Sequence, residues 1–240
     1  MRQGSVILNV DGLDAAYGRA QVLFGVSLSL DRGETVALMG RNGAGKSSTL
    51  KAIMGLLPAR AGSIQFAGQE ISRLPTYRIA RLGLGYVPEE RRIFTDLSVF
   101  ENLQVGLRGP PQAGRPAWTP ERLFSIFPNL AEMRGRQASQ MSGGEQQMLS
   151  IARTLMGNPD AILLDEPTEG LAPVIVDEMA EAVQRMKAEG IAVLLCEQNL
   201  NFASAVADRA YLIAKGAVRH EGRMADIAGD IALREAHLGL

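Results

Sequence analysis

The feature that most constrains the fold is a glycine-rich segment between a strand-like run and a helix-like run. Residues 34–39 (ETVALM) predict a buried strand, residues 40–48 read GRNGAGKSS, and residues 49–54 (TLKAIM) have helical character. This fits G-x-x-x-x-G-K-[ST] in the strand–loop–helix context that a phosphate-binding loop requires. A dinucleotide fingerprint would need a glycine where Ser48 stands, so the sequence excludes that type of site here.

Each residue type in this segment, which we refer to as the phosphate loop, has a physical reason to be there. The glycines let the backbone curl so that its N–H groups point toward a phosphate, and the following helix adds its positive dipole end. Lys46 can reach the β- and γ-phosphates, and the Ser47 hydroxyl can bind Mg²⁺. We therefore predict a nucleotide site that contains Gly40, Asn42, Gly43, Ala44, Gly45, Lys46, Ser47 and Ser48.

A second acidic element follows a later apolar strand. Residues 161–166 read AILLDE, and ligands of open α/β sheets bind beyond the carboxyl ends of the strands. Asp165 is therefore predicted to hold Mg²⁺, and Glu166 to orient or deprotonate an attacking water. Taken alone, the two carboxylates could also be a simple turn after a strand; the phosphate loop upstream favours the functional interpretation.

The composition limits what kind of protein can carry these motifs. The chain has 240 residues, of which 46% are hydrophobic and 21% charged, as in a globular domain. A net charge of -1 argues against binding nucleic acid by bulk electrostatics. No apolar run approaches the roughly 18–20 residues that cross a bilayer, and the N-terminus is unlike a secretory signal. We expect a single soluble, intracellular domain.

Strand-like and helix-like segments alternate in the second half of the chain, which predicts parallel βαβ units. A helix-rich middle interrupts this pattern, with a Pro- and Gly-rich loop at 108–120. The predicted strands and hairpins are 6–10, 22–30, 34–39, 62–71, 161–164, 191–196, 209–214 and 217–220. The predicted helices are 97–107, 121–127, 142–156, 173–188 and 200–207.

Residues 141–147 (MSGGEQQ), which we call the signature segment, open the predicted helix at 142–156. Ser142 and Glu145 have the spacing of a capping box, so the segment could be a purely structural helix start. The same N-terminus presents free N–H groups and a hydroxyl, which together make an anion site. A chain with two phosphate-binding elements calls for a common explanation.

The segments GRNGAGKSS, MSGGEQQMLSIARTL and AILLDEPTEGL together resemble the ATP-binding subunits of ABC transporters, and the resemblance runs from about residue 6 to 222. It implies an α/β fold: a P-loop NTPase core of ABC ATPase type with an N-terminal antiparallel β-subdomain and an inserted α-helical subdomain. On this basis, residues 1–240 form one ABC ATPase domain. Its core and β-subdomain would lie in 1–87 and 160–240, and the helical subdomain with the signature segment in 88–159.

The resemblance also implies how the site residues act. In this family two ATPase subunits close head to tail, and each ATP lies between one subunit's phosphate loop and the other's signature. Residues of this chain in the signature would therefore contact the partner's ATP, namely Ser142, Gly143, Gly144 and Glu145. Tyr17 occupies the place of the aromatic residue that stacks on adenine. The catalytic residues would be Glu166, Lys46 and Gln198, and the Mg²⁺ ligands Ser47, Asp165 and Glu89.

Three positions depart from the usual family pattern. Glu89 stands where Gln is usual, Gln198 where His is usual, and Ala172 where Asp is usual. Glu89 keeps an oxygen ligand but adds a charge, and Gln198 can donate a hydrogen bond to phosphate but cannot titrate. These departures put the communication between the two ATP sites in doubt. With the segments VPEERRIF, EGLAP and CEQN, they resemble the LivF-type ATPase of branched-chain amino acid importers.

That subgroup implies the partners and the location. Its ATPases use ATP and Mg²⁺ and work with a second ABC ATPase, as a heterodimer or a homodimer, with two transmembrane permeases and with a periplasmic binding protein. The expected location is peripheral, on the cytoplasmic face of the inner membrane, with residues 89–94 (EERRIF) and the helical insert toward the permeases. The cargo would be branched-chain amino acids or related small amides and acids.

The same motifs occur in proteins with other functions. An ATPase of an exporter, for example of lipids, has a similar length, and a degenerate ATP-binding regulatory subunit is a further alternative. A switch GTPase also carries a phosphate loop, but it recognises guanine through an Asn-Lys-x-Asp element. The nearest stretch, Asn158-Pro159-Asp160, lacks the lysine.

Overall fold

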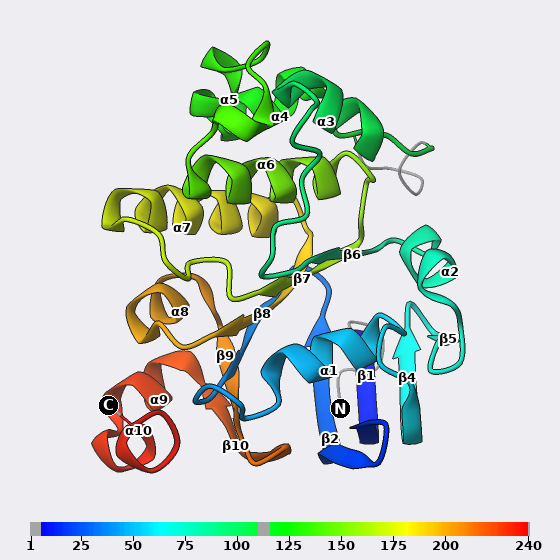
Figure 1. The fold of residues 1–240 in the computed structure, drawn as a ribbon. Coiled ribbons are helices and arrows are strands. Elements are labelled where there is room, and N and C mark those ends of the chain that lie inside the picture. The colour runs from blue at the N-terminus through cyan, green and yellow to red at the C-terminus, as the bar shows by residue number, and fades with distance from the viewer. Residues whose placement is uncertain (1–5, 110–115, 240) are drawn as a thin grey trace.

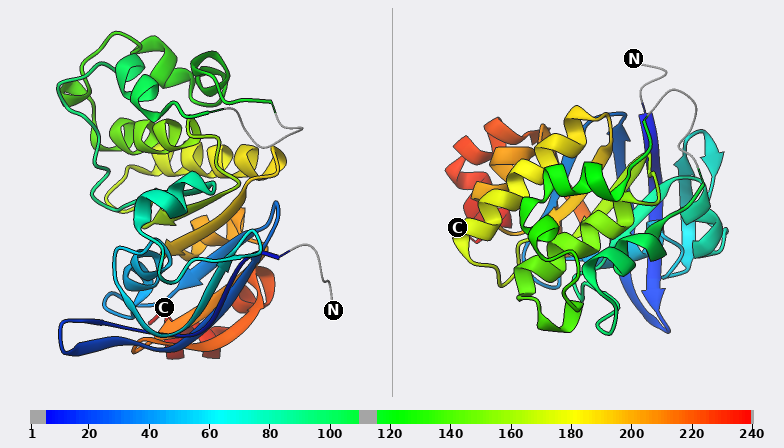
Figure 2. Two further views of the ribbon diagram at one scale, coloured as in Figure 1. Left: turned by 90° about the vertical axis from the view of Figure 1, so that its right-hand side faces the viewer. Right: turned by 90° about the horizontal axis from the view of Figure 1, so that it is seen from above.

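The computed structural model describes residues 6–109 and 116–239, which contain two β-sheets. One sheet is antiparallel with strand order β2-β1-β4-β5. Its strands are β1 (Val6–Tyr17), β2 (Ala20–Asp31), β4 (Ala59–Phe66) and β5 (Gln69–Glu70). The β1–β2 hairpin extends to one side of the molecule (Figure 2).

The other sheet is the mixed sheet of the core, with order β10-β9-β3-β8-β7-β6. Five of its strands run parallel, and only β10 is antiparallel to its neighbour. Its strands are β3 (Thr35–Met39), β6 (Leu84–Val87), β7 (Ala161–Asp165), β8 (Ala192–Glu197), β9 (Arg209–Ala214) and β10 (Ala217–Arg223). Because β3, β7 and β8 are adjacent and parallel, their carboxyl ends meet at one edge of the sheet.

The helices form layers on this framework (Figure 1). Helix α1 (Lys46–Ile53) follows β3 directly, and α2 (Thr76–Arg81) precedes β6. The helical insert stands on the far side of the core sheet from the antiparallel sheet and consists of α3 (Val99–Gly106), α4 (Pro120–Ile126), α5 (Pro128–Glu132), a short 3₁₀ turn (Ala138–Gln140) and α6 (Gly143–Leu155). The later helices are α7 (Pro173–Ala188), α8 (Leu200–Val206), α9 (Met224–Gly229) and α10 (Ile231–His237).

Alternation along β3 explains why the core sheet is buried on both faces. Ala37 and Met39 pack into the hydrophobic cluster under the helical insert, α7 and α8. Val36 and Leu38 pack into a second cluster shared with α1 and the antiparallel sheet. Successive side chains of a strand point to opposite faces, so a run of apolar residues is needed when both faces are covered. Within the described residues, no helix has the length and apolar character to cross a bilayer.

The predicted fold class is confirmed: an α/β core with an antiparallel sheet and a helical insert. The predicted strands at 6–10 and 22–30 were too short, because β1 and β2 continue to their turn at 18–19. The loop predicted at 108–120 ends earlier than expected, since Pro120 begins α4; its residues 110–115 lie outside the described residues. Four short helices were not predicted: α2, α5, α9 and α10.

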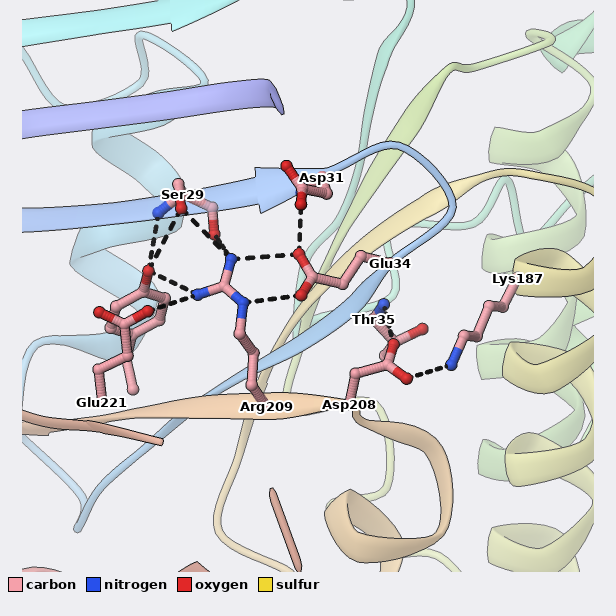
Figure 3. A network of polar contacts seen from close by, with 9 residues as sticks. Ser29, Asp31, Glu34, Thr35, Lys187, Asp208, Arg209 and Glu221 are labelled. Atoms are coloured by element: carbon pink, nitrogen blue, oxygen red, sulfur yellow. Dashed lines mark hydrogen bonds and ion pairs between the residues drawn. The ribbon is translucent and has the colours of Figure 1, made fainter. Parts of the chain in front are cut away.

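The two sheets are joined by a charged network around Arg209 on β9 (Figure 3). Its guanidinium forms a two-pronged ion pair with Glu34, at 2.7 Å for Nε–Oε1 and 3.1 Å for Nη2–Oε2. It also donates to the Ser29 carbonyl on β2 at 2.6 Å and to Glu221 on β10 at 3.0 Å. The side chains of Arg209 and Glu34 are only 19% and 16% exposed. This single residue therefore ties β2 to the core sheet.

We expect Arg209→Ala to lower the free energy of unfolding by about 2–4 kcal/mol, because removing one partner leaves a largely buried carboxylate without its counter-charge. The measurement is the denaturant midpoint and slope for the whole chain. Arg223→Ala is the matched control, since Arg223 pairs with Asp226 in a bond whose side chains are 78% and 59% exposed. Equal midpoints for the two variants would contradict the role given to Arg209.

Candidate functional site

A large cavity lies over the phosphate loop and has a volume of about 650 Å³. It opens where β3 ends and α1 begins, at the edge of the sheet where the carboxyl ends of β3, β7 and β8 meet. Its lining comes from β2, the phosphate loop and the segments that follow β6, β7 and β9. The residues are Gln21, Val22, Phe24, Asn42, Gly43, Gly45, Lys46, Ser47, Ser48, Glu89, Glu166, Glu169, Lys215 and Gly216.

Glycines make the phosphate loop possible for two different reasons. Gly45 caps α1 with φ of 112°, a left-handed conformation that other residues rarely adopt. At Gly40 the limit is space, because an added Cβ would collide with the carbonyl oxygen of Ile213 on β9. Ala44 is 7% exposed and packs below the loop. The loop therefore lies directly on the sheet, and its backbone lines the cavity.

Lys46 lies at the floor of this cavity and is 4% exposed. Its ammonium donates to the carbonyls of Gly40 at 2.9 Å and Arg41 at 3.3 Å, and it forms an ion pair with Glu166 at 3.0 Å. Burial raises the pKa of Glu166, but Lys46, Glu169 and Gln198 outweigh this effect, so the pKa lies below its usual value. The predicted lysine and the predicted carboxylate are thus brought together.

Asp165 presents a buried carboxylate at the end of β7 and is 1% exposed. Its Oδ2 accepts a hydrogen bond from the Tyr86 hydroxyl on β6 at 3.1 Å, whereas its Oδ1 has no hydrogen-bond partner in the described part of the chain. Burial raises the pKa of Asp165, and the hydroxyls of Ser47 and Tyr86 oppose the rise. A free carboxylate oxygen beside a serine hydroxyl is a donor set that suits Mg²⁺, which prefers oxygen ligands.

Glu166 adopts a left-handed backbone conformation, with φ of 46°. This backbone conformation is energetically unfavourable for residues other than glycine. Backbone strain of this kind often occurs at functional sites. The Glu166 N–H donates to the Cys196 carbonyl at 3.0 Å, which fixes the turn after β7 against β8. The position of the Glu166 carboxylate is therefore set by the backbone conformation as well as by the ion pair with Lys46.

Gln198 links the phosphate loop to Glu166. Its Nε2 donates to Asn42 Oδ1 at 2.5 Å and to Glu166 Oε2 at 3.1 Å, and Glu89 lines the same cavity. The neighbouring Glu197 is 3% exposed and was not predicted from the sequence. It accepts hydrogen bonds from the Thr168 hydroxyl at 2.6 Å and from the Gln198 N–H at 2.9 Å, so it holds the segments after β7 and β8 together.

The signature segment starts α6 with a complete capping box. The Glu145 N–H donates to Ser142 Oγ at 3.3 Å, and the Ser142 N–H donates to Glu145 Oε2 at 2.6 Å. Gly144 is required for packing, because an added Cβ would lie 2.7 Å from Ile175 on α7. None of Ser142, Gly143, Gly144 and Glu145 is among the residues described as lining the cavity over the phosphate loop. The structure therefore places the chain's two predicted phosphate-binding elements apart.

The aromatic residue beside the cavity differs from the predicted one. Tyr17 ends β1 and is 50% exposed, but it is not among the described lining residues. Phe24 on β2 does line the cavity and is 49% exposed. Adenine stacking by Tyr17 stays a prediction.

A phosphate loop at the carboxyl end of a parallel sheet, facing a strand that ends in Asp165 and Glu166, defines a P-loop nucleoside triphosphatase. A family model described as ABC transporter matches residues 23–169, more than half of the chain. The chain therefore belongs to the ABC transporter ATP-binding family, and it is an ABC ATPase subunit that binds and hydrolyses ATP.

Two relatives illustrate the range of tasks in this family. The chain is 40% identical to the high-affinity branched-chain amino acid transport ATP-binding protein BraG of Pseudomonas aeruginosa, over 97% of this chain and 100% of that protein. It is 35% identical to the lipopolysaccharide export system ATP-binding protein LptB of Escherichia coli K12, over 97% of each.

The structure is also similar to solved ATP-binding cassettes. A nucleotide-free cassette from an ABC transporter superposes with a TM-score of 0.81 at 27% identity, covering 96% of this chain and 98% of that one. The ATP-binding subunit of another ABC transporter gives a TM-score of 0.80 at 31% identity, covering 97% and 96%. The fold seen here is thus that of an ATP-binding cassette.

Proposed function

We propose that this chain is the ATP-hydrolysing subunit of an importer for branched-chain amino acids or related small amides and acids. The 40% identity to BraG over the full length of that protein is the observation that supports this class of transported substrate. The substitutions at Glu89, Ala172 and Gln198 support the same subgroup, because they match the pattern of its ATPases. Export, as in LptB, is the second candidate.

The mechanism begins with the phosphates of ATP entering the cavity over the phosphate loop. The γ-phosphate takes the place of Glu166 as the partner of Lys46, because an ammonium and the loop N–H groups converge there. Glu166, released from the ion pair, accepts a proton from water as the water oxygen attacks the γ-phosphorus. The bond to the bridging oxygen breaks, and ADP and phosphate leave. Gln198 donates a hydrogen bond to the γ-phosphate.

Ser47, Asp165 and Glu89 are the residues that would hold Mg²⁺, which supplies charge neutralisation on the phosphates when bound. The fit rests on the free Oδ1 of Asp165 and on an all-oxygen donor set. Tyr86 holds the other oxygen of Asp165, so only one is left for the cation and its waters.

A second ATPase subunit completes each site in this proposal. The signature segment lies at an N-terminus of a 13-residue helix, outside the chain's own cavity, so its anion site is available to a partner's ATP. Two ATP molecules would close two subunits head to tail, and hydrolysis would separate them. In this proposal, residues of the signature segment contact the ATP that the partner binds, namely Ser142, Gly143, Gly144 and Glu145. The helical subdomain, residues 88–159, carries this segment.

The permeases would contact the boundary between the core and the helical insert. A cavity of about 310 Å³ there is lined by Phe94, Val105 and Arg153, and an adjoining one by Tyr77. Phe94, Val105 and Tyr77 are 48%, 54% and 56% exposed, and exposed apolar side chains that are grouped together mark interaction sites. This placement agrees with a peripheral subunit on the cytoplasmic face of the inner membrane.

The experiment is uptake by the assembled complex. The chain, its partner ATPase, two permeases and the periplasmic binding protein are reconstituted in lipid vesicles with ATP on the side of the ATPases. We expect ATP-dependent accumulation of radiolabelled leucine, isoleucine or valine, and none with Lys46→Ala in this chain. ATP hydrolysis stimulated by lipopolysaccharide instead of amino acid would favour the export candidate and contradict the cargo proposed here.

A further inference from the structure

Helix α6 carries a buried amide for which the described residues provide no partner. Gln147 is 2% exposed, and neither its Nε2 nor its Oε1 has a hydrogen bond within the described ranges. The adjacent Gln146 is satisfied, since it donates to the carbonyls of Ala138 at 3.1 Å and Met141 at 3.3 Å. Buried polar groups are almost always paired with protein or ordered water, so two unpaired atoms on one side chain require an explanation.

Gln147 is among the residues that line a cavity of about 140 Å³. One water molecule takes up about 30 Å³ in the liquid, so the space is large enough for ordered water. Its walls are mostly polar and include the carboxylate that acts in hydrolysis. They consist of Glu89, Arg91, Gln147, Glu166, Pro167, Glu169 and Leu171. A roomy polar cavity with unpaired groups is the kind that holds water rather than staying dry.

Three segments line this cavity: α6, the segment after β6 and the segment after β7, and α6 is bonded to the segment after β6. Ser150 Oγ, one turn after Gln147, donates to the Arg91 carbonyl at 2.6 Å. The Arg91 guanidinium lies against Gly143, where an added Cβ would be 2.8 Å from Nη1. Glu166, from the segment after β7, completes the wall. Gln147 of α6, Arg91 and Glu166 therefore border the same space.

We propose that this cavity is an ordered-water site anchored by the Gln147 amide, and that its water positions Glu166 for hydrolysis through hydrogen bonds. Gln147 acts through water and is a positioning residue. The inference rests on the proposed function, in which Glu166 accepts the proton. Because Ser142, five residues earlier on α6, faces the partner's ATP in that proposal, the water site connects the two ATP sites of a pair. Such a connection does not need the aspartate that Ala172 replaces.

The direct test is a high-resolution crystal structure of the full chain. We expect at least one well-ordered water within hydrogen-bonding distance of Gln147 Nε2 or Oε1, and a water-mediated link from it to Glu166. A cavity without ordered water, or a Gln147 amide bonded only to protein atoms, would overturn the proposal. This measurement does not depend on how any variant folds.

The functional test is Gln147→Met, which keeps the length of the side chain but removes both hydrogen-bonding atoms. In the complete transporter complex we expect kcat for ATP hydrolysis to fall by about tenfold or more, since misplacing a catalytic group has effects of this size. The KM for ATP and the unfolding midpoint should stay close to those of the wild type. In a Glu166→Gln background, Gln147→Met should still permit ATP-dependent pairing, because the water acts on the chemical step.

The matched control is Gln184→Met on α7, where the side chain is exposed and donates to the Ala205 carbonyl. It should leave kcat unchanged. If Gln147→Met hydrolyses ATP within about twofold of the wild type while Lys46→Ala does not, the water site has no catalytic role, and the proposed function stands. A wild-type complex without ATPase activity would instead overturn the proposed function.

Discussion

Replacing Lys46 by alanine is expected to abolish ATP hydrolysis, with a loss of at least about 100-fold in kcat/KM, because a buried charge-assisted bond to phosphate has no substitute at this position. Lys46 is the buried cation of the cavity, whereas Lys215, the other lysine described in the lining, is exposed. Without its ammonium, the phosphate loop keeps its N–H groups but loses the positive charge for which Glu166 and the γ-phosphate compete.

The measurement is phosphate release by the complete complex, with ATP binding by a fluorescent analogue as a second readout. Lys51→Ala is the matched control: it removes an ammonium from the same helix, but Lys51 is not among the described residues of the cavity lining. We expect the control to stay within about threefold of the wild type. Wild-type turnover by Lys46→Ala would show that the nucleotide site lies elsewhere.

The central parts of the site could be predicted because their spacing is tied to local backbone geometry. A loop between a strand and a helix has few ways to arrange Gly45 and Lys46, and a strand that ends in Asp165 must present it at the sheet edge. The capping box of Ser142 is local in the same sense. Where the chemistry depends on a few neighbouring residues, sequence and structure agree.

The residues that the sequence did not reveal act across strands. Tyr86 contacts Asp165 only because β6 and β7 are paired in parallel, 79 positions apart in the chain. Glu197 holds Thr168 through the pairing of β7 and β8. Gln147 looks like an ordinary helix residue until its burial and its missing partners are visible. None of these has a spacing signal that a single sequence could carry.

The helices that were not predicted have a simpler cause. Helix α9 buries only Met224 and Ile227, and α10 buries none of its residues. Segments of six or seven residues with so little apolar periodicity give almost no signal in sequence, and they are held by contacts with the completed sheet. Similarly, the sequence alone does not predict that Phe24 lines the cavity, because this depends on where β2 lies in the fold.

Replacing Glu166 by glutamine is expected to leave ATP binding intact, to lower kcat by about 100-fold to 10,000-fold, and to hold the subunit pair closed. The amide has nearly the shape of the carboxylate, and its one oxygen can still accept a hydrogen bond from Lys46, although its NH2 group cannot accept from Gln198. It cannot accept a proton from the attacking water. Because ATP favours the closed pair and its hydrolysis opens it, the blocked variant should accumulate as an ATP-bound dimer, measured by analytical ultracentrifugation with and without ATP.

Glu169→Gln is the matched control for this variant. Glu169 lines the same cavity and is hydrogen-bonded to Glu166, and this bond raises the pKa of Glu169, with burial and the negative charges of Glu166 and Glu89 adding to the rise. A neutral amide at position 169 can donate a hydrogen bond to Glu166 and removes a neighbouring negative charge, so turnover should fall by less than about tenfold. If Glu169→Gln lost hydrolysis and Glu166→Gln kept it, the proton would be taken by Glu169, and the strained turn at Glu166 would serve only to position it.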